Sequence, residues 1–224
     1  MDIVWIHGFP LSSAIFEEQR AIKGATHHMP DLPLGLSSMD ECARWVLEHS
    51  PQKAVFAGFS MGGYIAFAIA RIAPERVAGL ILIDTRETAD TPEAKKGRYD
   101  TIEKVKEKGT GVVVDAMLPK MLTPAASPAL VEKVRAIMAS RTKEGVINSL
   151  KAMAERPDSS DLLPRIKVPT LVIVGADDAV TPLADAQRMA RAIPGAKLVT
   201  IPGAAHLSTM EKSEDVNRAV EEFT

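Results

Sequence analysis

The sequence has very little cysteine and no marked excess of charge of either sign. Cys42 is the single cysteine among 224 residues, so no intramolecular disulfide can form and nothing indicates an oxidising compartment. We expect Cys42 to be a small apolar residue within a helix. The 27 Lys and Arg residues nearly balance the 29 Asp and Glu residues, without a long run of either sign. This balance argues against nucleic acid as a partner.

Long apolar runs and cofactor motifs are also absent. No run approaches the roughly 18 residues of a membrane-spanning helix, and the apolar segment 3–6 is too short for a signal peptide. We therefore expect a soluble, cytoplasmic protein with no membrane partner. The sequence contains no phosphate-binding glycine loop and no His-Glu-x-x-His, and the adjacent His27 and His28 would point to opposite faces of a strand. We expect no cofactor and no metal site.

Short runs rich in Val and Ile alternate with helical patterns along most of the chain. This alternation is typical of parallel βα units and predicts an α/β protein with a doubly wound, mainly parallel sheet of about six strands. The expected strands are 2–7, 26–30, 53–58, 77–84, 170–175 and 197–201. Core helices are expected over 39–49 and 61–73, around 216–223, and from Thr181-Pro182, with Thr181 as N-cap and Pro182 at the first helical position.

Residues 86–161 interrupt this alternation with helical patterns near 93–108, 110–122, 129–141 and 143–154. We predict an all-helical cap here, inserted between two strands of a core that comprises residues 1–85 and 162–224. Four methionines of the cap either fill an irregular helical core or line an adaptable apolar substrate pocket, a role that suits their flexible, polarisable side chains. They are Met117, Met121, Met138 and Met153.

The segment 53–64 combines a predicted strand, a Gly-x-Ser-x-Gly pattern and an apolar helix. A serine in such a tight strand-to-helix turn is held in a strained conformation with its hydroxyl above the sheet, and the glycines avoid clashes with neighbouring backbone. The helix N-terminus favours the negative charge that develops when a carbonyl is attacked. Ser60 is therefore the candidate nucleophile.

A serine nucleophile requires a base, and the base requires an acid to orient it. Among the five histidines, His206 lies in a loop just after the last predicted strand, where open α/β sheets place ligand-binding groups. Asp178 is the favoured acid, while Asp177 beside it and Asp84 at the end of another strand remain alternatives. The order Ser60, Asp178, His206 is the one associated with the α/β-hydrolase fold.

Four segments together resemble the α/β-hydrolase superfamily, and in particular small bacterial esterases and 3-oxoadipate enol-lactonases. They are His-Gly-Phe-Pro at 7–10, Gly-Phe-Ser-Met-Gly-Gly at 58–63, the segment 169–182 with its Gly-Ala-Asp-Asp, and Gly-Ala-Ala-His-Leu at 203–207. The resemblance implies Asp178 as the acid. It also implies an oxyanion hole formed by the backbone N–H groups of Phe9 and Met61. His7 is then best explained as part of a loop that shapes the site.

Two features depart from that family pattern. Residues 31–37 lack the usual His-Gly pair and are one residue short, so we expect this loop to be rebuilt or poorly ordered. The two strands that usually precede the strand leading to His-Gly have no counterpart. The strand at 26–30 would then form a sheet edge, and we expect either a homodimer over this edge or reduced stability.

The sequence thus predicts a serine hydrolase that cleaves a small carboxylic ester or lactone through an acyl-enzyme on Ser60. His206 would act as base and Asp178 as the orienting acid. Two alternatives remain: a C–C bond hydrolase or hydroxynitrile lyase that uses the same triad, and a small-ligand receptor in which the triad is vestigial.

Overall fold

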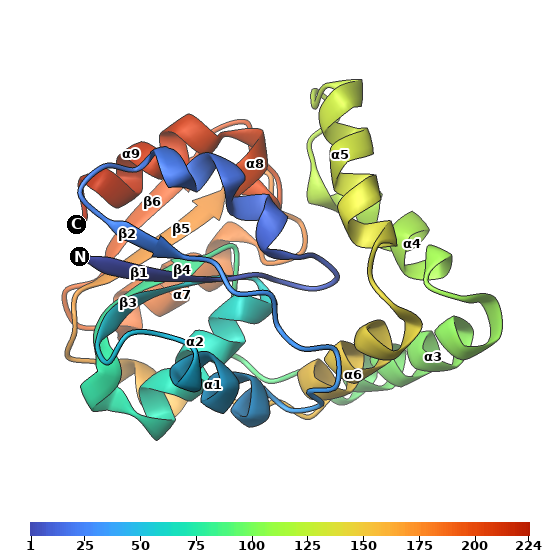
Figure 1. Cartoon of the computed structure of the whole chain (residues 1–224), viewed down its shortest axis with the longest axis horizontal. Helices are drawn as coiled ribbons and strands as arrows, with labels where there is room; N and C mark the ends of the chain where they lie inside the picture. The colour runs from blue at the N-terminus through green and yellow to red at the C-terminus, as the bar shows by residue number, and fades with distance from the viewer.

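Six parallel strands form one sheet, in the order β2-β1-β3-β4-β5-β6, in the computed structural model, which describes residues 1–224 (Figure 1). The predicted α/β fold class is therefore confirmed. The strands are β1 (Asp2–Ile6), β2 (Thr26–His28), β3 (Ala54–Phe59), β4 (Val77–Ile83), β5 (Thr170–Gly175) and β6 (Lys197–Ile201).

Alternate residues of the central strands face two separate apolar layers. In β1, Val4 and Ile6 belong to one buried cluster while Ile3 and Trp5 belong to the other, because successive side chains of a strand point to opposite faces. Helices cover both layers, which explains why the central strands are continuous apolar runs rather than alternating ones.

Helices α1 (Met39–Glu48), α2 (Met61–Ile72) and α7 (Leu183–Ala192) contribute to one layer. The 3₁₀-helix η1 (Ser13–Ala21) and α9 (Ser213–Glu221), preceded by the short α8 (Ser208–Glu211), contribute to the other. The 3₁₀-helices η2 (Pro74–Arg76) and η3 (Ser160–Arg165) are connections. The sequence analysis assigned no element to η1 or α8.

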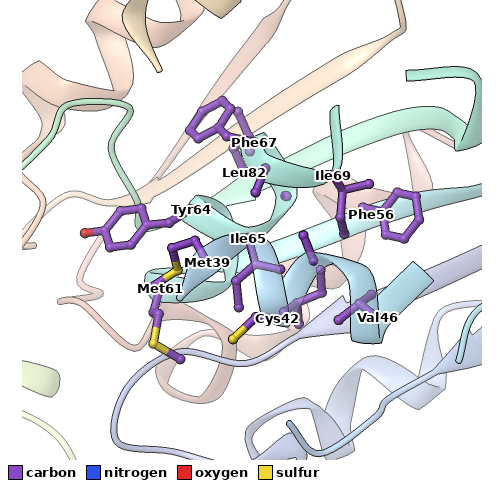
Figure 2. Close-up of a cluster of buried hydrophobic side chains, with 14 of the residues drawn as sticks. Met39, Cys42, Val46, Phe56, Met61, Tyr64, Ile65, Phe67, Ile69 and Leu82 are labelled. Carbon is purple, nitrogen blue, oxygen red and sulfur yellow. The ribbon is translucent and has the colours of Figure 1, made fainter. Parts of the chain in front are cut away.

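Helix α2 is buried over most of its length, and Figure 2 shows its side chains packed between α1 and the sheet. Cys42 of α1 lies in this cluster with 5% of its surface exposed. Burial raises the pKa of its thiol to about 12. Cys42 is thus an inert apolar residue of a helix, as expected from the sequence.

Between β4 and β5 the chain forms four helices and no strand: α3 (Pro92–Lys108), α4 (Gly111–Met121), α5 (Pro128–Ala139) and α6 (Lys143–Ala154). Helix α6 packs along α3, and α4 contacts both α3 and α5. They lie together to one side of the sheet (Figure 1). None of the protein's helices combines the length and the apolar character that a membrane span requires.

The predicted start of α7 is wrong by one residue. Pro182 is the N-cap and the helix begins at Leu183, so Thr181 does not cap it. Instead, the Thr181 hydroxyl donates a 2.6 Å hydrogen bond to Asp178. The Thr181 hydroxyl bonds to Asp178 rather than capping the helix because the turn 178–181 brings the two side chains together.

Strand β2 lies at one edge of the sheet and β6 at the other. At three residues, β2 leaves few unpaired backbone groups, which limits edge-to-edge pairing. The homodimer over this edge stays a prediction.

The glycines of the strand-to-helix turn are fixed by close backbone approach, which yields a stability prediction. A Cβ atom on Gly62 would lie 2.0 Å from the carbonyl oxygen of Ile6, and one on Gly58 would lie 2.3 Å from that of Gly62. We expect Gly62→Ala to lower the free energy of unfolding by about 1–3 kcal/mol or more, with a fall in Tm of roughly 2–4 °C per kcal/mol.

Gly97 in α3 is the matched control, because a Cβ there meets no atom within 4 Å. Gly97→Ala should raise stability by up to about 1 kcal/mol, since alanine loses less conformational entropy in a helix. Thermal unfolding of the three proteins checks both expectations, and equal Tm values for the two variants would refute the role of close approach.

Candidate active site

The site lies where the chain changes the side of the sheet to which it adds new strands. From β1 the chain adds β2 on one side and then crosses to β3 on the other. Ligand sites of open α/β sheets lie outside the carboxyl ends of the strands at such a switch point. The loop that follows β1 carries Phe9, and the turn that follows β3 carries Ser60.

Ser60 occupies the turn between β3 and α2 with φ 52° and ψ −116°. Residues other than glycine rarely adopt these backbone angles, so the surrounding structure must impose them on Ser60. The Ser60 N–H donates to the carbonyl of Ile83 in β4 (2.9 Å), and the Thr85 hydroxyl donates to the Ser60 carbonyl (2.7 Å). These bonds fix the backbone and leave the Ser60 hydroxyl free to project above the sheet.

His206 is fully buried and contacts the serine. Its Nε2 atom lies 3.0 Å from the Ser60 Oγ, close enough to accept the hydroxyl proton. The Phe59 ring packs against the imidazole at 5.2 Å between centroids. The geometry suits a general base that is held in position before substrate arrives.

Asp178 accepts a hydrogen bond from the His206 Nδ1–H through Oδ2 at 2.9 Å. Its Oδ1 accepts from the N–H groups of Val180 (2.7 Å) and Thr181 (2.9 Å). Burial alone would raise the pKa of Asp178, but the hydrogen bonds and charge of His206, with those from Thr181, lower it. Asp178 is therefore a carboxylate that favours an imidazolium at His206.

The two alternative acids lie elsewhere. The Asp177 side chain is exposed, and only its backbone N–H reaches the histidine loop, at the Ala204 carbonyl (2.9 Å). Asp84 is buried and bonds to the Gly175 N–H (2.8 Å) and to the Ser208 hydroxyl rather than to the imidazole.

The environment of Asp84 disfavours its charged form. Burial first, and then the nearby charge of Asp178, raise the pKa of Asp84 well above its usual value. Two adjacent buried carboxyl groups do not both ionise readily. Asp84 thus ties the β5 end to the segment after His206, in surroundings that favour its neutral form.

Several contacts draw the histidine loop against the sheet and the cap. A Cβ on Gly175 would lie 2.1 Å from the Ala205 carbonyl oxygen, so β5 and the loop touch through backbone. Glu211 accepts from the N–H groups of Ala205 and Thr123, both at 2.8 Å. The Leu207 N–H donates to the carbonyl of Met121, the last residue of α4, at 2.8 Å.

The loop after β1 presents the first of the two predicted oxyanion donors. Phe9 lines the same cavity as Ser60, and its N–H has no hydrogen-bond partner within the protein. Met61 is the first residue of α2, where a helix N–H has no intrahelical acceptor. Both donors are therefore available to an external oxygen.

His7 holds the Phe9 loop from beneath. Its Nδ1–H donates to the Gly8 carbonyl (3.1 Å), and its Nε2 accepts from the Leu32 N–H (3.2 Å). The Leu34 carbonyl in turn accepts from Asn148 of α6 at 2.9 Å. The loop 31–37, expected to be rebuilt, thus links the Phe9 loop to the cap.

A cavity of about 290 Å³ opens above Ser60, near the lower end of the roughly 300–1,000 Å³ of ligand pockets. Met117 and Met153 line it. Met121 and Met138 do not: both are fully buried in the apolar cluster formed by α4, α5 and the sheet face on the side of η1. Met117 and Met153 thus lie at the cavity, whereas Met121 and Met138 fill the helical core.

Sequence reasoning missed three side chains of this site. Thr181 bonds to Asp178, and its spacing of three residues from that aspartate was a usable signal. Glu211 ties the histidine loop to the cap, and Arg98 of α3 lines the cavity. Neither Glu211 nor Arg98 stands in a recognisable motif. No group of three or more His, Cys, Asp or Glu side chains is arranged to hold a metal ion.

Comparisons with known proteins agree with this geometry. A family model described as the alpha/beta hydrolase fold matches residues 3–213. The chain belongs to the α/β-hydrolase family. The family resemblance inferred from the four motifs is confirmed.

Individual relatives of this α/β hydrolase act on esters and lactones. It is 32% identical to 3-oxoadipate enol-lactonase 2 of Acinetobacter baylyi over 87% of this chain and 74% of that protein. It is 28% identical to a pimeloyl-[acyl-carrier protein] methyl ester esterase of Chromobacterium violaceum, over 99% and 93%. The structure of a thermophilic esterase from Thermogutta terrifontis with malate bound superposes with TM-score 0.95 and 39% identity, covering 99% of this chain and 88% of that one.

The buried His7 predicts a pH-dependent stability of this α/β hydrolase. Burial, reinforced by the charge of Arg141, lowers the pKa of His7 to about 4 from its ordinary value of 6.5. The folded pKa lies below the unfolded one, so the unfolded chain binds more protons in between. Stability from this group is complete above the unfolded pKa and is lost as pH falls toward the folded one.

Between about pH 7.5 and pH 5, this loss amounts to about 2 kcal/mol in the free energy of unfolding. Urea unfolding at the two pH values measures it. His7→Gln should flatten the dependence by that amount, whereas the exposed His49→Gln should keep the wild-type slope. A wild-type slope in His7→Gln would contradict a neutral buried His7.

Proposed function

We propose that this α/β hydrolase cleaves a small carboxylic ester or lactone through an acyl-enzyme on Ser60. The observation that carries the proposal is the continuous hydrogen-bonded series Ser60, His206 and Asp178, at 3.0 Å and 2.9 Å, opening into a cavity. The esterase and enol-lactonase names of its relatives support the same reaction class.

In the first step, the Ser60 oxygen attacks the substrate carbonyl and its proton passes to His206 Nε2. The imidazolium that forms lies against the Asp178 carboxylate, which also fixes the ring so that Nε2 faces the serine. The four donors around Asp178 keep it charged, so the proton stays on the imidazole.

The carbonyl oxygen becomes an oxyanion between the N–H groups of Phe9 and Met61. Because these backbone donors are already in place, no reorganisation is needed as the charge develops. Each such donor contributes about 3–4 kcal/mol to the transition state. The N-terminal end of α2 adds to the stabilisation of the negative charge.

Collapse of the tetrahedral intermediate breaks the bond to the alkoxide, which takes the proton from His206 and leaves as an alcohol. In a lactone, that alcohol stays attached to the acyl chain and the ring opens. Water then enters, gives a proton to His206 and attacks the acyl carbonyl. The second intermediate releases Ser60 and a carboxylic acid.

Replacing the nucleophile tests this mechanism directly. Ser60→Ala should lower kcat for p-nitrophenyl acetate by on the order of 10⁴-fold or more, because no acyl-enzyme can form. Ser140, the exposed C-cap residue of α5, provides the matched control, and Ser140→Ala should have the kcat of the wild type. Undiminished ester hydrolysis by Ser60→Ala would refute the proposal, as would a wild type that cleaves β-diketones or cyanohydrins but no ester.

The two buried carboxyl groups are distinguished by a second pair of variants. Asp178→Asn should lower kcat by on the order of 10³–10⁴-fold, because the amide stabilises neither the required tautomer nor the imidazolium. Asp84→Asn should retain most activity, since an amide can still accept from the Gly175 N–H and donate to the Ser208 hydroxyl. The reverse ranking of kcat values would assign the acid to Asp84.

A further inference from the structure

The cavity above Ser60 contains a single charged side chain. Nine of its 13 lining residues are hydrophobic, and the remainder are Ser60, Gly97, Thr101 and Arg98. Arg98 lies on α3, one turn before Thr101, and its side chain is 24% exposed. A guanidinium in an otherwise apolar cavity is costly to desolvate unless it binds something there.

Only some of the hydrogen-bond donors of Arg98 have a strong acceptor. Its Nε and Nη2 atoms donate to the two oxygens of Asp90, the latter at 3.2 Å. The Nη1 atom meets only the sulfur of Met153 at 3.4 Å, and a thioether is a weak acceptor. Since Met153 itself lines the cavity, Nη1 is a strong donor beside the cavity without a strong acceptor.

Asp90 is not dedicated to Arg98, because it also accepts a hydrogen bond from a second guanidinium. Arg156 donates to Asp90 Oδ1 at 2.7 Å and is itself nearly inaccessible to solvent. Burial alone would raise the pKa of Asp90, but the hydrogen bonds and charges of Arg98 and Arg156 lower it. A further carboxylate, Asp158, acts electrostatically on Arg156.

The cluster also holds Arg98 in place. Arg156 donates to the carbonyls of Thr88 (2.9 Å) and Met153 (2.8 Å), and its guanidinium lies 4.1 Å from the centre of the Tyr64 ring. Arg156 thereby fixes Asp90 relative to the C-terminal end of α6. The two hydrogen bonds from Arg98 to Asp90 then orient the guanidinium of Arg98. A preorganised guanidinium of this kind is suited to a carboxylate.

We propose that Arg98 is a specificity-determining residue that binds a carboxylate of the substrate through Nη1. This inference rests on the function proposed above and narrows its substrate class to esters or lactones that carry a carboxylate besides the scissile group. The anion displaces the weak sulfur contact, while the apolar wall of the cavity packs against the carbon chain between the two groups.

The test compares two p-nitrophenyl esters of equal length: the hemi-ester of adipic acid and the ester of hexanoic acid. They differ only in whether the acyl chain ends in a carboxylate or a methyl group. Wild type should prefer the anionic ester in kcat/KM, and Arg98→Gln should lower this preference by about tenfold or more, as expected for a charged hydrogen bond. The effect should appear mainly in KM, because Arg98 does not contact the reacting atoms.

Three further variants separate recognition from structure. Lys96→Gln removes the same charge from the exposed side of α3 and should leave the preference unchanged. Arg98→Lys should restore part of the preference. Thr101→Asp places a carboxylate on the cavity wall one turn from Arg98, where it can occupy Nη1 and repel a second anion, so it should lower the preference as Arg98→Gln does. The Tm of each variant shows whether it is folded.

Two outcomes overturn the inference while the proposed function stands: a wild type that hydrolyses both esters equally, and an unchanged preference in Arg98→Gln. If the wild type cleaves neither ester, p-nitrophenyl acetate shows whether the proposed function fails as well. The inference is then decided by titrating Ser60→Ala with adipate and hexanoate in a calorimeter. Binding of adipate that Arg98→Gln abolishes supports the anion site, and equal or absent binding of both refutes it.

Discussion

The contact on which the site depends is the close approach of the α2 N-terminus to the end of β1. Without a side chain at Gly62, the helix comes near enough for its backbone to touch the Ile6 carbonyl. This approach forces Ser60 into its strained conformation and sets Met61, at the first position of α2, opposite the loop that carries Phe9. Ser60 and the two predicted oxyanion donors are therefore positioned by one packing constraint, which explains why the glycines, the serine and the His-Gly-Phe loop lie together.

Hydrogen bonding, and not burial alone, determines whether the surroundings of Asp84 and Asp178 favour the charged or the neutral carboxyl group. Asp84 and Asp178 both follow central strands and both are buried. Asp178 receives four donors and is charged, whereas Asp84 receives two and is pushed towards its neutral form by burial and by its neighbour. In its neutral form, Asp84 would avoid repulsion with the Asp178 carboxylate, and its bond to Ser208 ties the histidine loop to the sheet.

This difference also marks how far sequence reasoning reaches. Hydrophobic periodicity predicts the six strands and the helical insertion, because burial on both sheet faces writes continuous apolar runs into the chain. Motif and strand ends point to Ser60 and His206, but they leave Asp84, Asp177 and Asp178 as alternatives, since which carboxyl reaches the imidazole is set by side-chain direction. Sequence reasoning also could not separate Met117 and Met153 from Met121 and Met138, and it missed Arg98, whose environment depends on Asp90 just before α3 and on Arg156 just after α6.

The cap does more than enclose the cavity. The carbonyl of Met121 in α4 accepts a hydrogen bond from the Leu207 N–H, on one side of His206. On the other side, Glu211 accepts from the N–H groups of both Ala205 and Thr123, and so joins the histidine loop to the end of α4. Helices α3, α4 and α6 supply the cavity wall, and α6 also reaches the Phe9 loop through Asn148 and Leu34. The cavity wall and the contacts that hold His206 thus come from the same elements. A displacement of α4 would move the histidine loop as well as the cavity wall, so under the proposed function we expect selectivity and turnover to be coupled through these backbone hydrogen bonds.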